Sequence, residues 1–217
     1  MVAKAKGRIP PDMDPALLEE TFSQQLTSGT VSDATAIDTI LPPLFSPRGQ
    51  PSTVDRCIWR SVTLSHPGAQ RLRMRDSRIE NADLANINLT GSSFERVETL
   101  STRLTGATCS EAQWSSVLFQ ECKLDLALLR MARLDRCVFE RCNLTETDFY
   151  SADLTGVIFR KCDLSRADLS HAKLAGADIR DCRIDGMRGT PATMAGLLVS
   201  ADQAPLLITL FGVRVEP

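Results

Sequence analysis

The sequence of 217 residues has few of the features that mark enzymes, membrane proteins and nucleic-acid-binding proteins. It has only two histidines, His66 and His171, and neither lies in a metal-binding signature such as H-E-x-x-H. It has no phosphate-binding glycine loop and no G-x-S-x-G motif. No apolar stretch approaches the length of a membrane span, and the net charge is only −2. We therefore expect a cytoplasmic protein that is not an enzyme, holds no cofactor or metal, and binds neither a membrane nor nucleic acid directly.

Helical and strand periodicities are also missing from residues 52–186. This stretch divides without a gap into twenty-seven blocks of five residues, from STVDR and CIWRS to ADIRD and CRIDG. The middle residue is large and apolar in twenty-four blocks, with exceptions at Ala69, Thr99 and Cys109. The residue two positions earlier is Ala, Ser, Thr, Cys or Val in twenty-four blocks as well. A short fixed repeat of this kind predicts a solenoid with two inward-facing positions in each block.

The blocks ADLAN, CNLTE, ADLTG, CDLSR and ADLSH resemble the A-(D/N)-L-x-x signature of the bacterial pentapeptide-repeat family, over about three fifths of the chain. The resemblance implies an all-β solenoid, a right-handed quadrilateral β-helix with four blocks per coil. Residues twenty apart should then stack inside the rod. The sequence fits this geometry, because one column of middle residues reads Leu64, Leu84, Leu104, Leu124, Leu144, Leu164 and Ile184. With about 4.8 Å between coils, the repeat should form a rod about 32 Å long.

The repeat is flanked by two regions outside its register. Residues 1–51 are expected to be an irregular N-terminal segment, since they contain seven prolines and only Ala16–Gln25 has room for a short helix. Its later apolar residues are expected to cover the open end of the rod: Ile37, Ile40, Leu41, Leu44 and Phe45.

Residues 187–217 are expected to be a C-terminal cap with a short helix. Ser200 and Gln203 have the spacing of a capping box, Gly212 suits a helix C-terminus, and Pro205 predicts an irregular first turn. Similar segments in gyrase-protecting members of the family form caps and a two-fold contact, so the resemblance implies a homodimer. The candidate cap and dimer residues are Leu206, Leu207, Leu210 and Phe211.

All seven cysteines have a place in the repeat. Cys109 is a middle residue, and the others occupy the small inward position: Cys57, Cys122, Cys137, Cys142, Cys162 and Cys182. Buried thiols pack as small apolar groups, so we expect them to be reduced. The linear column from Cys122 to Cys182 does not suit zinc, which requires ligands that converge on one point. Stacked acids such as Asp148 and Asp168 are interpreted as turn supports and not as a catalytic pair.

Two functional hypotheses remain open. The resemblance implies a DNA mimic that occupies the DNA-binding saddle of gyrase or another type II topoisomerase, as quinolone-resistance members of the family do. A mimic should be acidic, yet residues 52–186 hold nineteen acidic and nineteen basic residues. Salt bridges between coils would account for such mixed charge. The candidate acidic surface consists of Glu80, Glu98, Glu121 and Glu140.

The alternative is a general interaction scaffold without a topoisomerase role. Leu118, Val138 and Ile158 occupy outward positions twenty residues apart and should form an exposed apolar ladder. Three further apolar residues at outward positions lie in the coil of Leu118: Leu126, Leu128 and Met131. Exposed apolar surface often marks a contact with another protein. The ladder could equally be covered by the N- or C-terminal segment of the chain itself.

Overall fold

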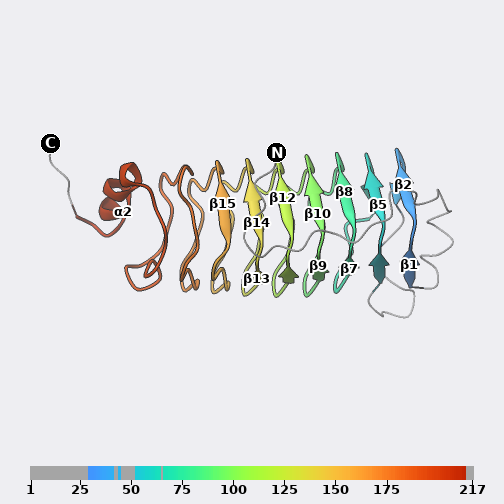
Figure 1. Cartoon of the computed structure of the whole chain (residues 1–217), viewed down its shortest axis with the longest axis horizontal. Helices are drawn as coiled ribbons and strands as arrows, with labels where there is room; N and C mark the ends of the chain where they lie inside the picture. The colour runs from blue at the N-terminus through green and yellow to red at the C-terminus, as the bar shows by residue number, and fades with distance from the viewer. Residues whose placement is uncertain (1–28, 42–43, 45–51, 65, 214–217) are drawn as a thin grey trace.

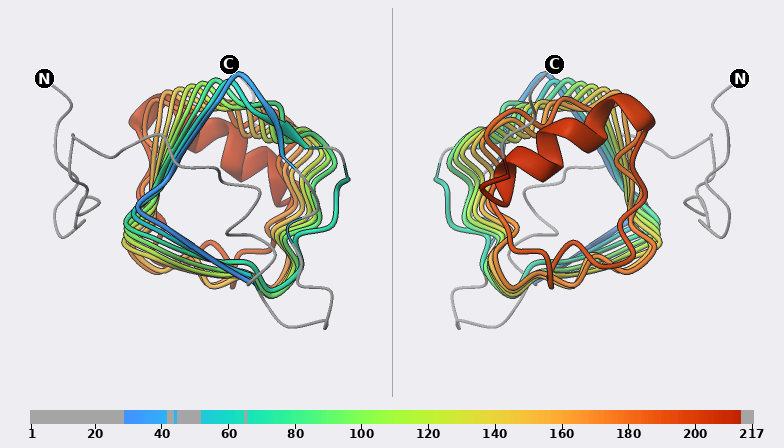
Figure 2. Two further views of the ribbon diagram at one scale, coloured as in Figure 1. Left: turned by 90° about the vertical axis from the view of Figure 1, so that its right-hand side faces the viewer. Right: turned by 90° about the vertical axis from the view of Figure 1, so that its left-hand side faces the viewer.

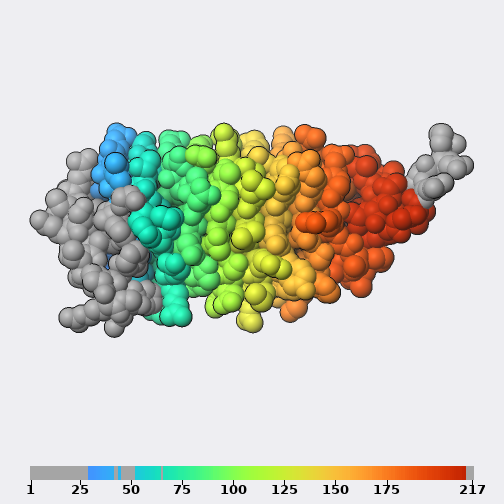
Figure 3. All heavy atoms as spheres, turned by 180° about the vertical axis from the view of Figure 1, so that it is seen from behind, coloured from blue at the N-terminus to red at the C-terminus, as the bar shows by residue number. Residues whose placement is uncertain are grey.

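Apolar side chains at every fifth residue wind the chain into a parallel β-solenoid (Figure 1). The computed structural model describes residues 29–41, 44, 52–64 and 66–213. Viewed along the rod, successive coils superpose in a four-sided outline (Figure 2). Space-filling atoms show the coils as successive bands along the rod (Figure 3). The all-β solenoid with a short C-terminal helix is therefore confirmed. We name the four faces by one inward residue each: the Leu134, Phe119, Leu124 and Leu129 faces.

Two faces are parallel sheets in which each strand pairs with the strand one coil away. On the Leu134 face the order is β1 (Thr30–Ser32), β4 (Thr53–Asp55), β7 (Arg73–Arg75), β9 (Ser93–Glu95), β11 (Gln113–Ser115) and β13 (Arg133–Asp135). On the Phe119 face it is β2 (Thr35–Ile37), β5 (Ile58–Arg60), β8 (Arg78–Glu80), β10 (Glu98–Leu100), β12 (Leu118–Gln120), β14 (Val138–Glu140) and β15 (Ile158–Arg160).

The other two faces have little regular strand. On the Leu124 face, β3 (Ile40–Leu41) pairs with β6 (Thr63–Leu64), and single parallel bridges such as Asp83 to Arg103 continue the ladder. The Leu129 face is held by similar bridges, for example Leu128 to Asp148. Residues twenty apart therefore stack on all four faces.

Left-handed backbone turns the chain at the corners. Twenty-three described residues other than glycine have φ between 46° and 62°, and nearly all of them end a five-residue block. Acidic or amide side chains near the corner support the turn: the Asp163 carboxylate accepts the Ser165 N–H at 2.9 Å, and Asp168 accepts the Ser170 N–H at 2.9 Å. The interpretation of Asp148 and Asp168 as turn supports is confirmed, since Asp148 likewise accepts the Tyr150 N–H at 2.8 Å.

The solenoid begins earlier than the repeat register predicts. Residues 30–41 form β1 to β3, which is a further coil, so the prediction of an irregular segment over all of residues 1–51 is wrong for this part. The repeat register did not reveal this coil because its spacing differs. Val31 pairs with Val54, 23 residues away, whereas paired residues in later coils are twenty residues apart. Leu41 and Leu44 are buried in the core, whereas Ile40 is exposed. Phe45 and Ala16–Gln25 lie outside the described residues.

Stacked columns of side chains fill the core. The ring of Phe139 lies 4.9 Å from that of Phe119 and 5.0 Å from that of Phe159, and both pairs are nearly parallel. All seven cysteines are buried, and none of them forms a disulfide. The thiols of Cys122, Cys142 and Cys162 donate to backbone carbonyl oxygens, as Cys142 does to Phe119 at 3.4 Å.

The C-terminal end of the rod is closed by its own backbone and by a helix. The ladder continues past Gly186, through bridges of Arg188 with Asp168 and of Leu198 with Asp178. A 3-10 turn η1 (Ala201–Gln203) and the helix α2 (Ala204–Leu210) follow, and the helix lies across the end of the solenoid (Figure 2). The expected short helix with an irregular first turn is therefore present.

Gln203 joins this cap to the last coil. Its buried amide nitrogen donates to the carbonyl oxygens of Ile179 at 2.9 Å and Cys182 at 2.7 Å, which would otherwise face the open end. Its amide oxygen accepts the Ser200 N–H at 2.9 Å, which is one half of the predicted capping box.

Replacing Gln203 by alanine should lower the free energy of unfolding by about 2 kcal/mol or more, because two buried carbonyl oxygens and one partly buried N–H lose a partner. Hydrogen exchange of the last coil should rise more than that of the middle coils. Urea unfolding and amide exchange measure the two effects. Gln113→Ala, which removes an exposed side chain, is the matched control; equal effects of the two variants would contradict a capping role.

Candidate functional site on the outer faces

The four candidate acids on the Phe119 face are engaged in ion pairs between and within coils. Glu80 is 2.9 Å from Arg60, and Glu98 is 2.6 Å from Arg78, each one coil away. Arg141 lies 2.9 Å from Glu121 and 2.6 Å from Glu140. The side chains of Glu80, Glu98 and Glu140 are at most 17% exposed, and only that of Glu121 is about half exposed.

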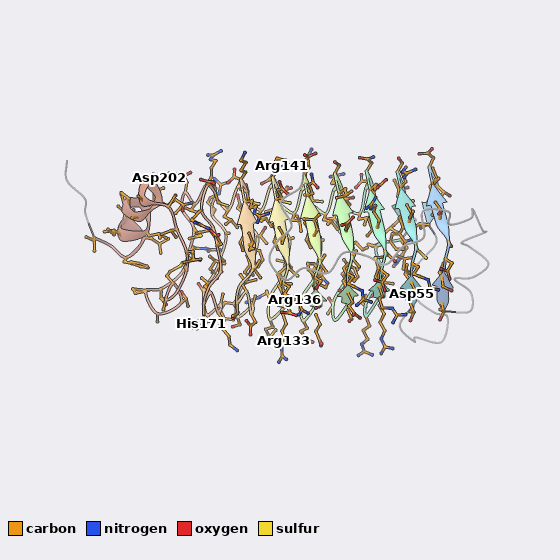
Figure 4. The ribbon with its side chains drawn as sticks, in the orientation of Figure 1. Asp55, Arg133, Arg136, Arg141, His171 and Asp202 are labelled. Carbon is orange, nitrogen blue, oxygen red and sulfur yellow. The ribbon has the colours of Figure 1, made fainter. Side chains whose placement is uncertain are left out.

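Similar pairs join the coils elsewhere on the surface. At a corner of the Leu134 face, Arg56 binds Asp33 at 2.5 Å and Arg96 binds Asp76 at 2.5 Å, so opposite charges alternate along the rod. Arg141 and Arg136 project at two different corners (Figure 4). The mixed charge of the sequence is thus largely used in contacts between neighbouring coils, and no uninterrupted acidic strip results among the described residues.

The apolar ladder differs from the sequence-based expectation. Leu118 and Val138 are only 6% and 2% exposed, so the prediction that they face solvent is wrong. They do not point into the core, because each precedes an inward phenylalanine and strand side chains alternate. They instead form a second hydrophobic cluster, with Leu100 and Ile158 packed against it. Their register is unchanged, because Val138 pairs with Leu118 on one side and with Ile158 on the other.

A second group of apolar residues is exposed as predicted, on the Leu129 face. Leu126 is 53% exposed, Leu128 39% and Met131 53%. Leu126 and Met131 both occupy left-handed corners, with φ of 61° and 57°. Every other residue with positive φ in the described part of the chain is polar, charged or glycine. The two hydrophobic corners are consecutive and lie on either side of Leu128.

Polar aromatic contacts extend this group along the same face. The Arg130 guanidinium lies 4.9 Å from the centre of the Tyr150 ring and 3.4 Å from Asp148. The Tyr150 ring in turn meets His171 edge-on at 5.1 Å. We call the set of Leu126, Leu128, Arg130, Met131, Tyr150 and His171 the Leu128 cluster. Arg130, Tyr150 and His171 were not among the candidate surface residues predicted from the sequence, although the twenty-residue spacing of Arg130 and Tyr150 was a signal for their contact.

The repeat matches a known family model. Residues 132–200 match the model described as pentapeptide repeat region. This chain carries a pentapeptide repeat. The resemblance stated from its blocks is thus confirmed, and the twenty-residue register extends the same architecture on the N-terminal side of the matched residues.

Two solved structures are similar to this chain at low identity. The chain is similar to a trypsin-treated variant of QnrB1, a plasmid-mediated fluoroquinolone resistance protein, with 17% identity, a TM-score of 0.49 and coverage of 89% of this chain and 94% of that chain. It is similar to HetL, involved in heterocyst differentiation regulation in the cyanobacterium Nostoc sp. strain PCC 7120, with 16% identity, a TM-score of 0.30 and coverage of 78% and 86%. No curated protein matches the chain.

The C-terminal cap presents part of its apolar surface. Leu206 is 42% exposed and Phe211 36%, whereas Leu207 and Leu210 pack against the core. A cavity of about 400 Å³ lies between the helix and the last coil, lined in part by Ile184, Met187 and Leu210. The four candidate residues are therefore divided between a packing role and an exposed surface.

The residues that the structure covers include no cluster suited to a metal ion. No three His, Cys, Asp or Glu side chains there are arranged to hold a metal ion. His66 and His171 lie on different coils, and His171 contacts Tyr150. The same residues include no helix with the length and hydrophobicity of a membrane span.

Proposed function

We propose that this protein is a non-catalytic binding protein and that the Leu128 cluster contacts a protein partner. The observation that carries the proposal is the pair of hydrophobic corners, Leu126 and Met131, on either side of exposed Leu128. A left-handed corner favours glycine or asparagine, so a large apolar residue there adds nothing to the turn. Two such residues at the ends of consecutive blocks are explained by a contact that the solenoid alone does not make.

The chemistry of the cluster suits the centre of an interface. Arginine, tyrosine and methionine are enriched in protein contacts, and an aromatic ring with a stacked guanidinium is a common anchor. The ring of Tyr150 is held between Arg130 and His171, which limits its freedom before a partner arrives. Ionic pairs such as Arg130 with Asp148 provide a polar rim.

A type II topoisomerase, with DNA gyrase as the example, is the partner to test first, because the five-residue blocks resemble those of gyrase-protecting proteins. In that role the chain would protect or modulate the enzyme. Mimicry of DNA would depend on the acids Glu80, Glu98, Glu121 and Glu140, and their pairing with arginine argues against it. A homodimer would form through the exposed Leu206 and Phe211 of the cap.

The test compares two sets of variants in binding to purified gyrase at two salt concentrations. The cluster variant is Leu126→Asn/Leu128→Asn/Met131→Ser, which uses residues found in the same columns at Asn86, Asn88 and Ser151. It should fold normally and weaken binding at least about tenfold, with little dependence on salt. The acid variant, with the four glutamates changed to glutamine, should stay within about threefold.

The opposite order, with loss only in the acid variant and mainly at low salt, would replace the proposal by mimicry. If the protein does not bind gyrase, gyrase is excluded as its partner. In this case a photo-crosslinking residue at position 128 identifies the true one, with a crosslinker at exposed Lys123 on the Leu124 face as control. Crosslinks at both positions to the same set of proteins would contradict a specific role of the cluster.

A further inference from the structure

Two leucines in one coil differ sharply in exposure. Leu118 and Leu128 occupy the same position in their blocks, on opposite faces, yet Leu118 is 6% exposed and Leu128 39%. Val138, one coil from Leu118, is 2% exposed. The Leu134 face is a parallel sheet like the Phe119 face, and there the outward Gln113 and Arg133 at the same block position are exposed. A place in a sheet therefore does not by itself bury Leu118, and the difference points to material that lies over the Phe119 face.

A polar atom at the edge of this ladder is also shielded. Glu140 binds Arg141 through one carboxylate oxygen at 2.6 Å, while its other oxygen is buried and has no hydrogen-bond partner among the described residues. A buried carboxylate oxygen normally has a donor. The cover over Val138 is therefore expected to bring a donor as well as apolar groups.

The length of each segment outside the described residues limits which of them can reach Leu118 and Val138. Leu118 is four coils from β2, which is about 19 Å, and Val138 is one coil further. Residues 45–51 are fixed between Leu44 and Ser52 near the N-terminal end, so they extend at most about 13 Å from it. Residues 214–217 follow the helix at the other end. Residues 1–28 are fixed only at Gly29 and can span about 90 Å when extended.

The composition of residues 1–28 fits the ladder. Leu18, Phe22 and Leu26 are four residues apart, with Leu17 beside them, and would share one side of a helix. Three basic residues near the chain start are potential donors to the carboxylates of the Phe119 face: Lys4, Lys6 and Arg8.

We propose that residues 1–28 dock on the Phe119 face and cover the apolar ladder of Leu118, Val138 and Ile158. The ladder is then an intramolecular docking surface and not a free partner site. The candidate acids Glu98, Glu121 and Glu140 lie on this same face, so a partner that binds them competes with the N-terminal segment.

Cysteine labelling tests the docking directly, because all seven native thiols are buried. Val138→Cys and Leu128→Cys are compared in the full chain and in a chain that begins at Gly29. In the full chain the thiol at position 138 should react at least about tenfold more slowly than the thiol at position 128. In the shortened chain the rate at position 138 should rise to that at position 128, which stays unchanged.

Point variants keep the test valid if the shortened chain does not fold, which labelling of the native thiols would reveal. Leu18→Ser/Phe22→Ser in the full chain should also expose position 138, whereas Ser23→Ala/Gln24→Ala should not. Slow labelling at position 138 in every variant would overturn the proposal. Protection that disappears on dilution would show that a second copy of the chain is the occupant, which also overturns it.

Discussion

Phe139→Ala should lower the free energy of unfolding by about 4 kcal/mol. Phe139 is fully buried and stacks between Phe119 and Phe159 at ring distances of 4.9 and 5.0 Å. Parallel pairing holds β12, β14 and β15 in register on both sides, so the backbone cannot close around the cavity. Urea unfolding followed by circular dichroism measures the loss.

Phe211→Ala is the control for this substitution. It removes the same ring from a site that is 36% exposed beside the cap helix, so the expected cost is below about 1 kcal/mol. Because each coil contacts only its neighbours, Phe139→Ala should also increase amide exchange in β12 and β15 more than in β5. Similar costs for both variants would contradict a core in which the middle coils depend on stacking.

The free energy of unfolding should fall steeply above about pH 9. Burial raises the pKa of the Cys57 thiol from 9.0 to about 11 and that of Cys109 to about 12. The unfolded chain loses these protons first as pH rises, so the stability present below pH 9 is lost between pH 9 and about 12. Two thiols contribute a slope of about 2.7 kcal/mol per pH unit near pH 10.

Urea unfolding at a series of pH values measures this slope. Cys109→Ala, which places the residue found at Ala69 in the same column, should reduce the slope by about 1.4 kcal/mol per pH unit. Lys123→Ala, at an exposed site, should leave it unchanged. A slope that is the same in all three proteins would show that the buried thiols do not set the alkaline limit of stability.

Local regularity is the part of the fold that the sequence predicts. Phe119, Phe139 and Phe159 stack because they are twenty residues apart, which is one full coil of four blocks. The first coil escaped prediction although Val31, Ala36 and Leu41 keep the five-residue spacing, since three additional residues before Ser52 shift its register.

The surface was predictable only in part. The exposure of Leu126, Leu128 and Met131 followed from their block positions, but the contacts of Tyr150 depend on residues from neighbouring coils. The burial of Leu118 could not be predicted from the repeat, because Leu128 has the same position and remains exposed. The burial of outward side chains on one face depends on contacts that the five-residue repeat does not specify.

The twenty-residue register also fixes the direction in which each side chain points around the rod axis. One extra block inserted between Glu146 and Thr147 would move every later side chain to the next face, and the cap helix would rotate a quarter turn relative to Leu128. Four extra blocks would restore the direction and lengthen the rod by about 4.8 Å. A partner that touches both Leu128 and the cap would therefore bind only those homologues in which the number of blocks between the two sites differs by a multiple of four.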